Sequence, residues 1–374
     1  MAGSEVSTQS FALETGEGRK PAKKMRLAVI GAGGIAGTQL REFAKWPDEV
    51  EIVALADIKD RPMMTYADTY KVPKDHCFCD FNDMLRKIKP DAVTVCTPNG
   101  MHMPAAVAAL KAGAHVITEK PMAMNAKECQ KMIDAAKANK RKLVIGFQYR
   151  YSPRTQFIKH AADEGQFGKI MYARVQALRR RGIPNWGVFG QKHLQGGGPM
   201  IDIGVHVLEM THFAMGSPKP VSAIGNTFTY LGNKPSEVQS QWKGWDHKTY
   251  TVEDLAVGQI RFETGAVLTI EASFAAHIEK DMWTFQLMGE KGGCTWDPPT
   301  IFRDDAGHMI NVEPGWLGSA GFGELFHAKI RNFVDHVLYN QPTMAPAEHG
   351  LMVQKMLDGI YASSDKGGKE VLIK

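Results

Sequence analysis

The sequence predicts a two-domain protein: an α/β domain with a parallel sheet, followed by an α+β domain with a large, mostly antiparallel open sheet. Three observations predict it. Strand-like apolar runs alternate with helical patterns from residue 25 to about 148, which indicates right-handed βα crossovers. The first run ends in the glycine-rich segment GAGGIAG at 31–37. After about residue 169 the apolar runs become longer and follow one another, as antiparallel strands do.

The elements of the first domain follow in order, and each ends at a residue that breaks or caps it. A strand at 26–30 runs into glycines, a helix at 35–46 stops at Pro47, and a strand at 51–56 ends at Asp57. The remaining helices are expected at 62–70, 81–89, 104–112 and 126–139, and the remaining strands at 92–96, 115–118 and 143–146.

The second domain begins with an expected helix at 154–164 and ends with two amphipathic helices at 322–339 and 347–363. One helical pattern at 200–215 interrupts a series of strands, and a Thr-Gly pair at 264–265 is typical of a hairpin turn. These strands are expected at 170–180, 221–230, 253–262, 266–274 and 283–288.

We therefore divide the chain into a polar N-terminal extension at 1–24, a Rossmann domain at 25–148, and a domain for substrate binding and oligomerisation at 149–374. Whether the C-terminal helices pack back on the first domain stays open at this point. The extension has acidic residues where a secretory signal needs a basic flank, and it lacks an apolar segment.

The composition excludes several classes of function. Lys and Arg number 45 against 40 Asp and Glu, so the net charge is only +5, and no basic stripe indicates a nucleic-acid binder. No apolar run reaches the roughly 18 residues that span a bilayer. The five cysteines are odd in number and lack zinc spacing, which favours free thiols in the cytoplasm and no metal site: Cys77, Cys79, Cys96, Cys129 and Cys294.

The glycine segment has the spacing of a dinucleotide-binding loop, G-x-G-x-x-A. Gly31 permits the tight turn, Gly33 lets the backbone approach a pyrophosphate, and Ala36 is small enough for close packing of helix on strand. The helix that begins near Gly34 and Ile35 points its free N–H groups at the phosphate. A glycine turn without a ligand is the alternative interpretation.

Asp57 ends the second strand, 21 residues beyond the last position of the glycine motif. That distance is close to the spacing of about 20 residues at which an acid binds the adenosine ribose. Because a carboxylate repels a 2′-phosphate, the sequence favours NAD over NADP. Lys59 and Arg61 follow closely and soften this preference.

Four ordered motifs from both domains carry a resemblance to a known family. They are GAGGIAG at 31–37, TPNGMH at 97–102, EKP at 119–121 and GGGPMIDIGVH at 196–206. With these motifs the chain resembles the Gfo/Idh/MocA oxidoreductase family, which includes glucose–fructose oxidoreductase and inositol dehydrogenase. The resemblance extends from Lys24 to the C-terminus.

The resemblance implies an active site and an assembly. It implies that Lys120 lies near the nicotinamide, that Asp202 and His206 form the family's acid–histidine pair, and that the open sheet joins subunits into a homodimer or homotetramer. Glu209 departs from the family pattern, which often has Asp three residues after the histidine. The segment RRRGIPNW at 179–186 resembles, more loosely, a substrate loop of the sugar-acting members.

The chemistry of alcohol oxidation gives these three residues roles. Lys120 follows a strand at the edge where open α/β sheets bind ligands, so it can hold the reacting oxygen and stabilise alkoxide charge. His206 can take the hydroxyl proton near neutral pH. Asp202, one helical turn earlier, can orient the substrate or tune the histidine. A core histidine satisfied by a neighbouring carboxylate is the alternative.

Further cofactor candidates follow two strands. Thr97, Pro98 and Asn99 form a turn expected to contact the cofactor, and His102 either approaches the ligand or caps the next helix. Glu119 either pairs with the neighbouring lysine or only shapes the turn.

Three residues of the second domain are candidates for contact with the substrate. Arg150 and Tyr151 lie where the chain leaves the first domain and are expected to line the cleft. Trp186 offers an apolar face that suits a sugar ring, and a buried packing role is equally compatible with its sequence context.

The leading prediction is thus an NAD-dependent dehydrogenase of a sugar, sugar derivative or cyclitol, with a small-molecule substrate and neither nucleic acid nor membrane as partner. One alternative is a glycosidase that keeps NAD bound and uses transient oxidation. Another is a ligand-sensing regulator that kept the fold and lost catalysis, against which the intact Lys120, Asp202 and His206 argue.

Overall fold

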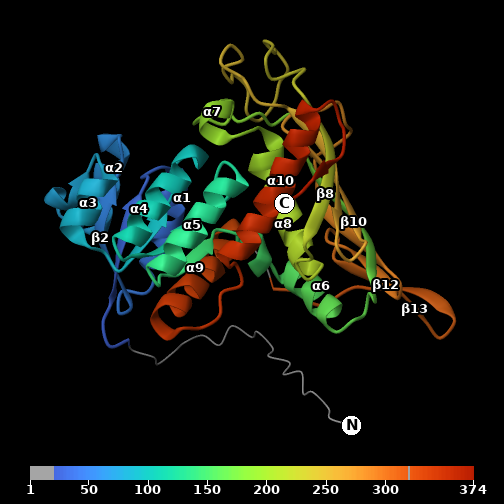
Figure 1. Ribbon diagram of the computed structural model, residues 1–374, viewed down its shortest axis with the longest axis horizontal. Coiled ribbons are helices and arrows are strands. Elements are labelled where there is room, and N and C mark those ends of the chain that lie inside the picture. The colour runs from blue at the N-terminus through green and yellow to red at the C-terminus, as the bar shows by residue number, and fades with distance from the viewer. Residues whose placement is uncertain (1–20, 319–320) are drawn as a thin grey trace, which may run out of the picture.

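The computed structural model describes residues 21–318 and 321–374, and it consists of two sheets with helices between and around them (Figure 1). Most of the polar extension expected at 1–24 lies outside these residues. None of the described helices is both long and apolar enough to cross a bilayer.

The first sheet has six parallel strands in the order β3-β2-β1-β4-β5-β6. Strands β2 and β3 are added on one side of β1, and strands β4 to β6 on the other side. The order of the strands therefore reverses between β1 and β4, and ligands bind at such a switch point, beyond the carboxyl ends of the strands. The strands are β1 (Met25–Ile30), β2 (Val50–Ala56), β3 (Cys77–Phe78), β4 (Ala92–Val95), β5 (His115–Thr118) and β6 (Leu143–Ile145). The helices are α1 (Gly34–Phe43), α2 (Asp60–Tyr70), α3 (Phe81–Ile88), α4 (His102–Lys111) and α5 (Ala126–Ala138).

Every helix and strand that we expected in this domain is present. The strand missed by sequence, β3, is only two residues long and has no periodicity to detect. Strands inside the sheet are buried on both faces, as in β4, where all four residues are buried, because helices cover both faces of a parallel sheet.

The second sheet has nine strands in the order β14-β13-β12-β11-β7-β10-β9-β8-β15. Only the central pair β7–β10 is parallel, and the expected hairpin at 264–265 joins β9 to β10. The strands are β7 (Ile170–Leu178), β8 (Pro220–Phe228), β9 (Leu255–Phe262), β10 (Val267–Ser273), β11 (Met282–Gly289), β12 (Gly292–Thr295), β13 (Thr300–Asp305), β14 (His308–Val312) and β15 (Val371–Leu372).

Helices of the second domain cover one face of this sheet. They are α6 (Pro153–Asp163), α8 (Val205–Ala214) and α10 (Ala347–Asp365). The helical pattern expected at 200–215 is a π-helical turn, η4 (Met200–Gly204), that continues into α8. Shorter elements are η1 (Lys74–His76), η2 (Asn99–Met101), η3 (Gln148–Tyr151) and α7 (Lys192–Gln195).

The C-terminal part of the chain returns to the first domain. Helix α9 (Phe322–Tyr339) packs against α1, and α10 packs against both α5 and β8, so α5 and α10 lie between the two sheets (Figure 1). Next to α10 the backbone adds to the edge of the first sheet, where the amide of Ile145 donates to the carbonyl of Ala345 at 3.1 Å. The last fifty residues therefore help to complete the nucleotide domain.

Candidate active site

The loop after β1 is shaped to let a ligand approach its backbone. Gly31 has φ +91°, and a Cβ there would lie 2.7 Å from the backbone carbon of Cys96, so only glycine fits. At Gly33 and Gly34, by contrast, a Cβ would meet nothing within 4 Å, which leaves open space at the start of α1. Ala36 is fully buried between helix and sheet. The open space and the free N–H groups of the helix fit a pyrophosphate.

Asp57 is tied to this loop. Its Oδ2 accepts from the backbone N–H of Ala32 at 2.5 Å, and its Oδ1 accepts from that of Lys59 at 2.7 Å. The carboxylate thus lies beside the glycine turn at the end of β2, where an adenosine ribose binds in this fold. The residues present therefore fit a bound NAD.

The turn after β4 connects the two domains. The side-chain amide of Asn99 donates to the backbone oxygen of Gln195 at 2.9 Å. The ring of His102 is buried between two turns: it is 1% exposed, and its nitrogens lie 2.8 Å from the oxygen of Pro121 and 2.9 Å from that of Thr97. Burial lowers its pKa, so the neutral ring donates to one of these oxygens and braces the two turns.

Lys120 reaches across from the first domain to the second. Its ammonium donates to the backbone oxygen of Asp202 at 2.7 Å and to the carboxylate of the same residue at 3.0 Å. The two side chains are 14% and 16% exposed, so the pair is accessible to a ligand without being fully solvated. The expectation that Asp202 orients the substrate or tunes His206 is therefore refined: in this structure its carboxylate holds Lys120.

His206 lies beside the pair formed by Lys120 and Asp202. The ring is 8% exposed, and its Nδ1 is buried without a hydrogen-bond partner among the described residues. Burial, and then the charges of Lys120, Lys329 and Arg179, lower its pKa well below the ordinary value. The imidazole is therefore neutral at physiological pH and can accept a proton.

Three residues at this centre were not predicted as site residues. The ring of Tyr149 meets that of His206 edge-on at 5.1 Å, and the ring of Trp283 lies 6.0 Å from it. Arg179 is stacked 4.8 Å from Trp242, and its charge acts on His206. Only Arg179 had a sequence signal, because it begins the segment that resembles a substrate loop.

Arg150 and Tyr151 do not line the cleft, contrary to expectation. The side chain of Arg150 is fully buried and donates to Glu209 at 2.6 Å and to the backbone oxygen of Met344 at 2.7 Å. The hydroxyl of Tyr151 donates to Asn332 at 2.8 Å. Burial raises the pKa of Glu209 to about 7, against the lowering effect of the arginine. Both predicted residues anchor the domain junction.

Glu119 forms no hydrogen bond with Lys120 in the described structure. Its Oε1 accepts from the ammonium of Lys329 on α9 at 2.7 Å and from the amide of Gln39 at 2.5 Å. Burial raises its pKa, but Lys329, Lys120 and the hydrogen bonds outweigh burial and leave the pKa below its ordinary value. The carboxylate is therefore ionised at neutral pH.

Trp186 is 49% exposed, which excludes the buried packing role. Its ring contacts Phe189 at 6.0 Å and Trp242 at 4.9 Å, both edge-on. Because Trp242 also stacks on Arg179, these three rings form an aromatic cluster that extends from Arg179 to the surface.

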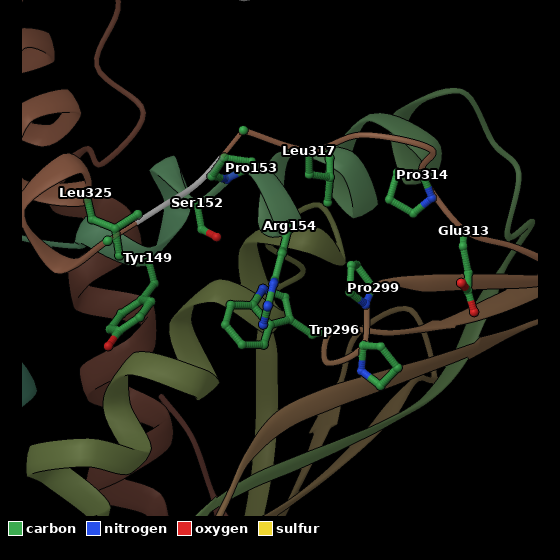
Figure 2. Close-up of a pocket in the computed structure, with 13 residues that line it drawn as sticks. Tyr149, Ser152, Pro153, Arg154, Trp296, Pro299, Glu313, Pro314, Leu317 and Leu325 are labelled. Carbon is green, nitrogen blue, oxygen red and sulfur yellow. The ribbon is translucent and has the colours of Figure 1, made fainter.

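A cavity of about 670 Å³ lies beside the centre (Figure 2). Tyr149 forms one end of it, and the hydroxyl of this residue points away from the other labelled residues. Between Tyr149 and the far end of the cavity, Arg154 stacks on Trp296 at 5.2 Å and pairs with Asp297 at 2.8 Å. Tyr149 thus separates this cavity from His206.

The part of the chain that the structure describes contains no candidate metal-binding site. No three His, Cys, Asp or Glu side chains gather there as a metal ion requires. All five cysteines are free, and burial raises the pKa of Cys96 and of Cys294 to about 12, so these two thiols are not reactive.

Family models and relatives agree with this geometry. Residues 25–147 match the oxidoreductase family with an NAD-binding Rossmann fold, and residues 159–372 match the C-terminal alpha/beta domain of the same family. A D-glucoside 3-dehydrogenase of Escherichia coli is 33% identical over 92% of this chain and 96% of its own length. A myo-inositol 2-dehydrogenase of Thermotoga maritima is 25% identical over 88% of this chain and 92% of its own.

The fold agrees as well. A levoglucosan dehydrogenase solved with NADH and levoglucosan superposes with a TM-score of 0.79 at 23% identity, and it covers 94% of this chain and 100% of its own. Two family models that span both sheets, and a relative of 33% identity along almost the whole chain, lead to one conclusion: the chain belongs to the Gfo/Idh/MocA family and is an NAD-dependent oxidoreductase.

Proposed function

We propose that the enzyme oxidises a secondary hydroxyl of a sugar, sugar derivative or cyclitol, or catalyses the reverse reduction. The observation that carries this proposal is the meeting of Lys120, Asp202 and the neutral imidazole of His206 at the carboxyl edge of the first sheet. Relatives named for glucoside and inositol oxidation support the substrate class. The functional division into a domain for NAD at 25–148 and a domain for substrate and subunit contacts at 149–374 is part of the proposal.

NAD would be held by residues from three loops, and it supplies the acceptor for the hydride. The glycine loop faces the pyrophosphate, Asp57 binds the adenosine ribose, and the turn after β4 borders the nicotinamide side. The residues are Gly31, Gly33, Gly34, Ile35, Ala36, Asp57, Thr97, Pro98 and Asn99.

The chain's own residues move the proton and hold the oxygen. The ammonium of Lys120, fixed by Asp202, donates to the reacting oxygen and stabilises the negative charge that develops on it. His206 accepts the hydroxyl proton, because its buried ring is neutral at physiological pH. Burial raises the pKa of Tyr149, so this phenol stays protonated and can donate to a neighbouring hydroxyl.

A glycoside is the substrate that we favour within this class. Trp186 and Trp242 offer apolar ring surface next to Arg179, and sugar rings pack well against aromatic faces. A D-glucoside 3-dehydrogenase is among the similar proteins. The polar side chains at the centre suit a neutral polyol.

The enzyme would act as a homodimer or homotetramer in the cytoplasm, where its free cysteines stay reduced. Among the described residues, helices cover one face of the nine-stranded sheet (Figure 1), and strands β8 and β11 of this sheet expose Ile224, Phe228 and Met288. Closed pairing of two such faces would bury them. Light scattering that gives a monomer mass at all working concentrations would contradict this assembly.

The test is a screen of free sugars, cyclitols and glycosides with NAD, read as absorbance of the reduced cofactor. We expect stoichiometric NADH release with at least one glycoside. A glycosidase with transient oxidation would instead release the aglycone with no net NADH. A protein that binds sugars with no turnover of either kind would favour a regulator.

A further inference from the structure

Four charges of alternating sign run from the second domain into the core of the first. Asp202 holds Lys120 at 3.0 Å, Glu119 precedes this lysine in the chain, and Lys329 holds Glu119 at 2.7 Å. The first two residues belong to the reacting centre. Lys329 does not: it comes from α9, 210 residues farther along the chain than Glu119.

The pair of Glu119 and Lys329 is held in place and shielded from water. The side chain of Lys329 is fully buried, with its ammonium 3.8 Å from the centre of the Phe326 ring. The Oε1 of Glu119 also accepts from Gln39 at 2.5 Å, and the hydroxyl of Thr94 donates to the oxygen of the same amide at 2.5 Å. The carboxylate therefore has little freedom to move.

A buried carboxylate needs a cation, and removal of one partner of a buried pair leaves an uncompensated charge. Two lysines act on Glu119, namely Lys329 and, more weakly, Lys120. If Lys329 were absent, the neighbouring Lys120 would be the remaining cation. Its single ammonium would then be shared between Glu119 and Asp202, which lie on opposite sides of the domain boundary.

We propose that Lys329 is a positioning residue for the catalytic lysine: by neutralising Glu119 from α9, it leaves the ammonium of Lys120 to Asp202 and to the reacting oxygen. This inference rests on the role given to Lys120 in the proposed function. Lys329 touches no substrate, and it acts through Glu119.

The first test is Lys329→Met, with kcat measured per NADH-titrated active site. The freed carboxylate draws Lys120 away from Asp202, so kcat should fall by about 10²-fold, as expected for a small misplacement of a reacting group. The double variant Glu119→Gln/Lys329→Met removes the competitor and should recover most of that loss. If Lys329→Met does not fold, Lys329→Gln, which keeps a donor without the charge, replaces it with the same expected direction.

The pH profile is a second readout that a purely structural role would not move. The groups that act on His206 are Lys120, Arg179 and Lys329, with Tyr149 packed against its ring and Asp202 on its own helical segment. Positive charges lower the pKa of this histidine. Loss of Lys329 should therefore move the acidic limb of kcat/KM to higher pH.

Arg331→Met is the matched control. Arg331 lies on α9, as Lys329 does. It pairs with Glu49 of the first domain and with Asp335 one turn farther along α9. Its loss should lower the melting temperature and leave kcat and the pH profile of the folded enzyme unchanged.

The outcomes separate this inference from the proposed function. A Lys329→Met enzyme that is only less stable, with normal kcat and profile, overturns the inference, and so does a double variant as slow as the single one. If Lys120→Met itself keeps normal turnover with the enzyme's substrate, the role given to Lys120 is wrong, whereas the proposed function fails only if the unmodified enzyme reduces no NAD with any sugar, cyclitol or glycoside. A slow Lys120→Met together with a normal Lys329→Met overturns the positioning role alone.

Discussion

At the scale of single residues, the side chains of two consecutive residues at the domain junction point to different surroundings. Tyr149 turns its ring to His206, whereas Arg150 is fully buried and pairs with Glu209. A short helix, η3 (Gln148–Tyr151), makes this difference, since consecutive residues of a helix point in different directions. The sequence located the junction, but the direction of each side chain depends on a turn too short to show periodicity.

Replacement of His206 tests the base. His206→Ala should reduce kcat by roughly 10²–10⁴-fold, the usual contribution of general acid–base catalysis, and leave NAD affinity nearly unchanged. Stopped-flow turnover and NADH titration measure the two quantities. Near-normal turnover at every pH would assign the base elsewhere, with Lys120 as the first candidate.

Replacement of Asp57 tests cofactor choice. The unmodified enzyme should bind NAD more tightly than NADP, because the carboxylate beside the glycine loop repels a 2′-phosphate. Asp57→Ala should narrow this difference by weakening NAD binding and easing the repulsion. Fluorescence titration with both reduced cofactors measures it, and equal affinities in the unmodified enzyme would contradict the assignment.

At the scale of elements, the glycine loop depends on both backbone conformation and space. Gly31 and Gly265 have nearly the same positive φ, +91° and +86°, but only a Cβ at Gly31 would meet another backbone. Gly265→Ala should therefore cost only the roughly 1–2 kcal/mol of a left-handed L-residue.

Gly31→Ala should lower the free energy of unfolding by more than Gly265→Ala does, and it should also weaken NAD binding, since the loop must move away from Cys96. Urea unfolding of both variants and NADH titration provide the comparison. Equal destabilisation with unchanged NADH affinity would mean that the loop adjusts freely.

Long, periodic elements could be predicted, and short or irregular ones could not. Helices such as α9 (Phe322–Tyr339) match the expected bounds, because an amphipathic stripe over many turns is a strong signal. Strand β12 (Gly292–Thr295) begins with two glycines and β13 (Thr300–Asp305) ends in charges, so neither alternates as a half-buried strand does. The motifs located Lys120, Asp202 and His206, but no pattern links Lys329 to Glu119.

At the scale of the whole molecule, buried histidines should make stability depend on pH. Burial is the first cause that lowers the pKa of His115 and His349 to about 4 and that of His212 to about 3. The unfolded chain binds protons at these groups near pH 6.5, whereas the folded chain does not. Their contribution to stability is therefore present above pH 6.5 and is lost as the pH falls toward 4.

Carboxyl groups with raised pKa values oppose this trend, but there are fewer of them among the described residues. Six histidines are lowered and three carboxyl groups are raised: His102, His115, His206, His212, His336 and His349 against Glu209, Glu253 and Asp358. The free energy of unfolding in urea should thus fall between pH 6.5 and 4. A constant or rising value across this window would contradict the histidine account.

The return of the C-terminal segment to the first domain also has a consequence for synthesis on the ribosome. The first six strands end at Ile145, but the lysine that neutralises buried Glu119 follows only at position 329. At about 5–20 residues per second, the nascent domain waits roughly 10–40 s for that lysine. During this interval the half-made protein has only Lys120 to offset the charge of Glu119, and the edge of its first sheet is uncovered, so we expect the nascent domain to fold fully only after the C-terminal helices are made.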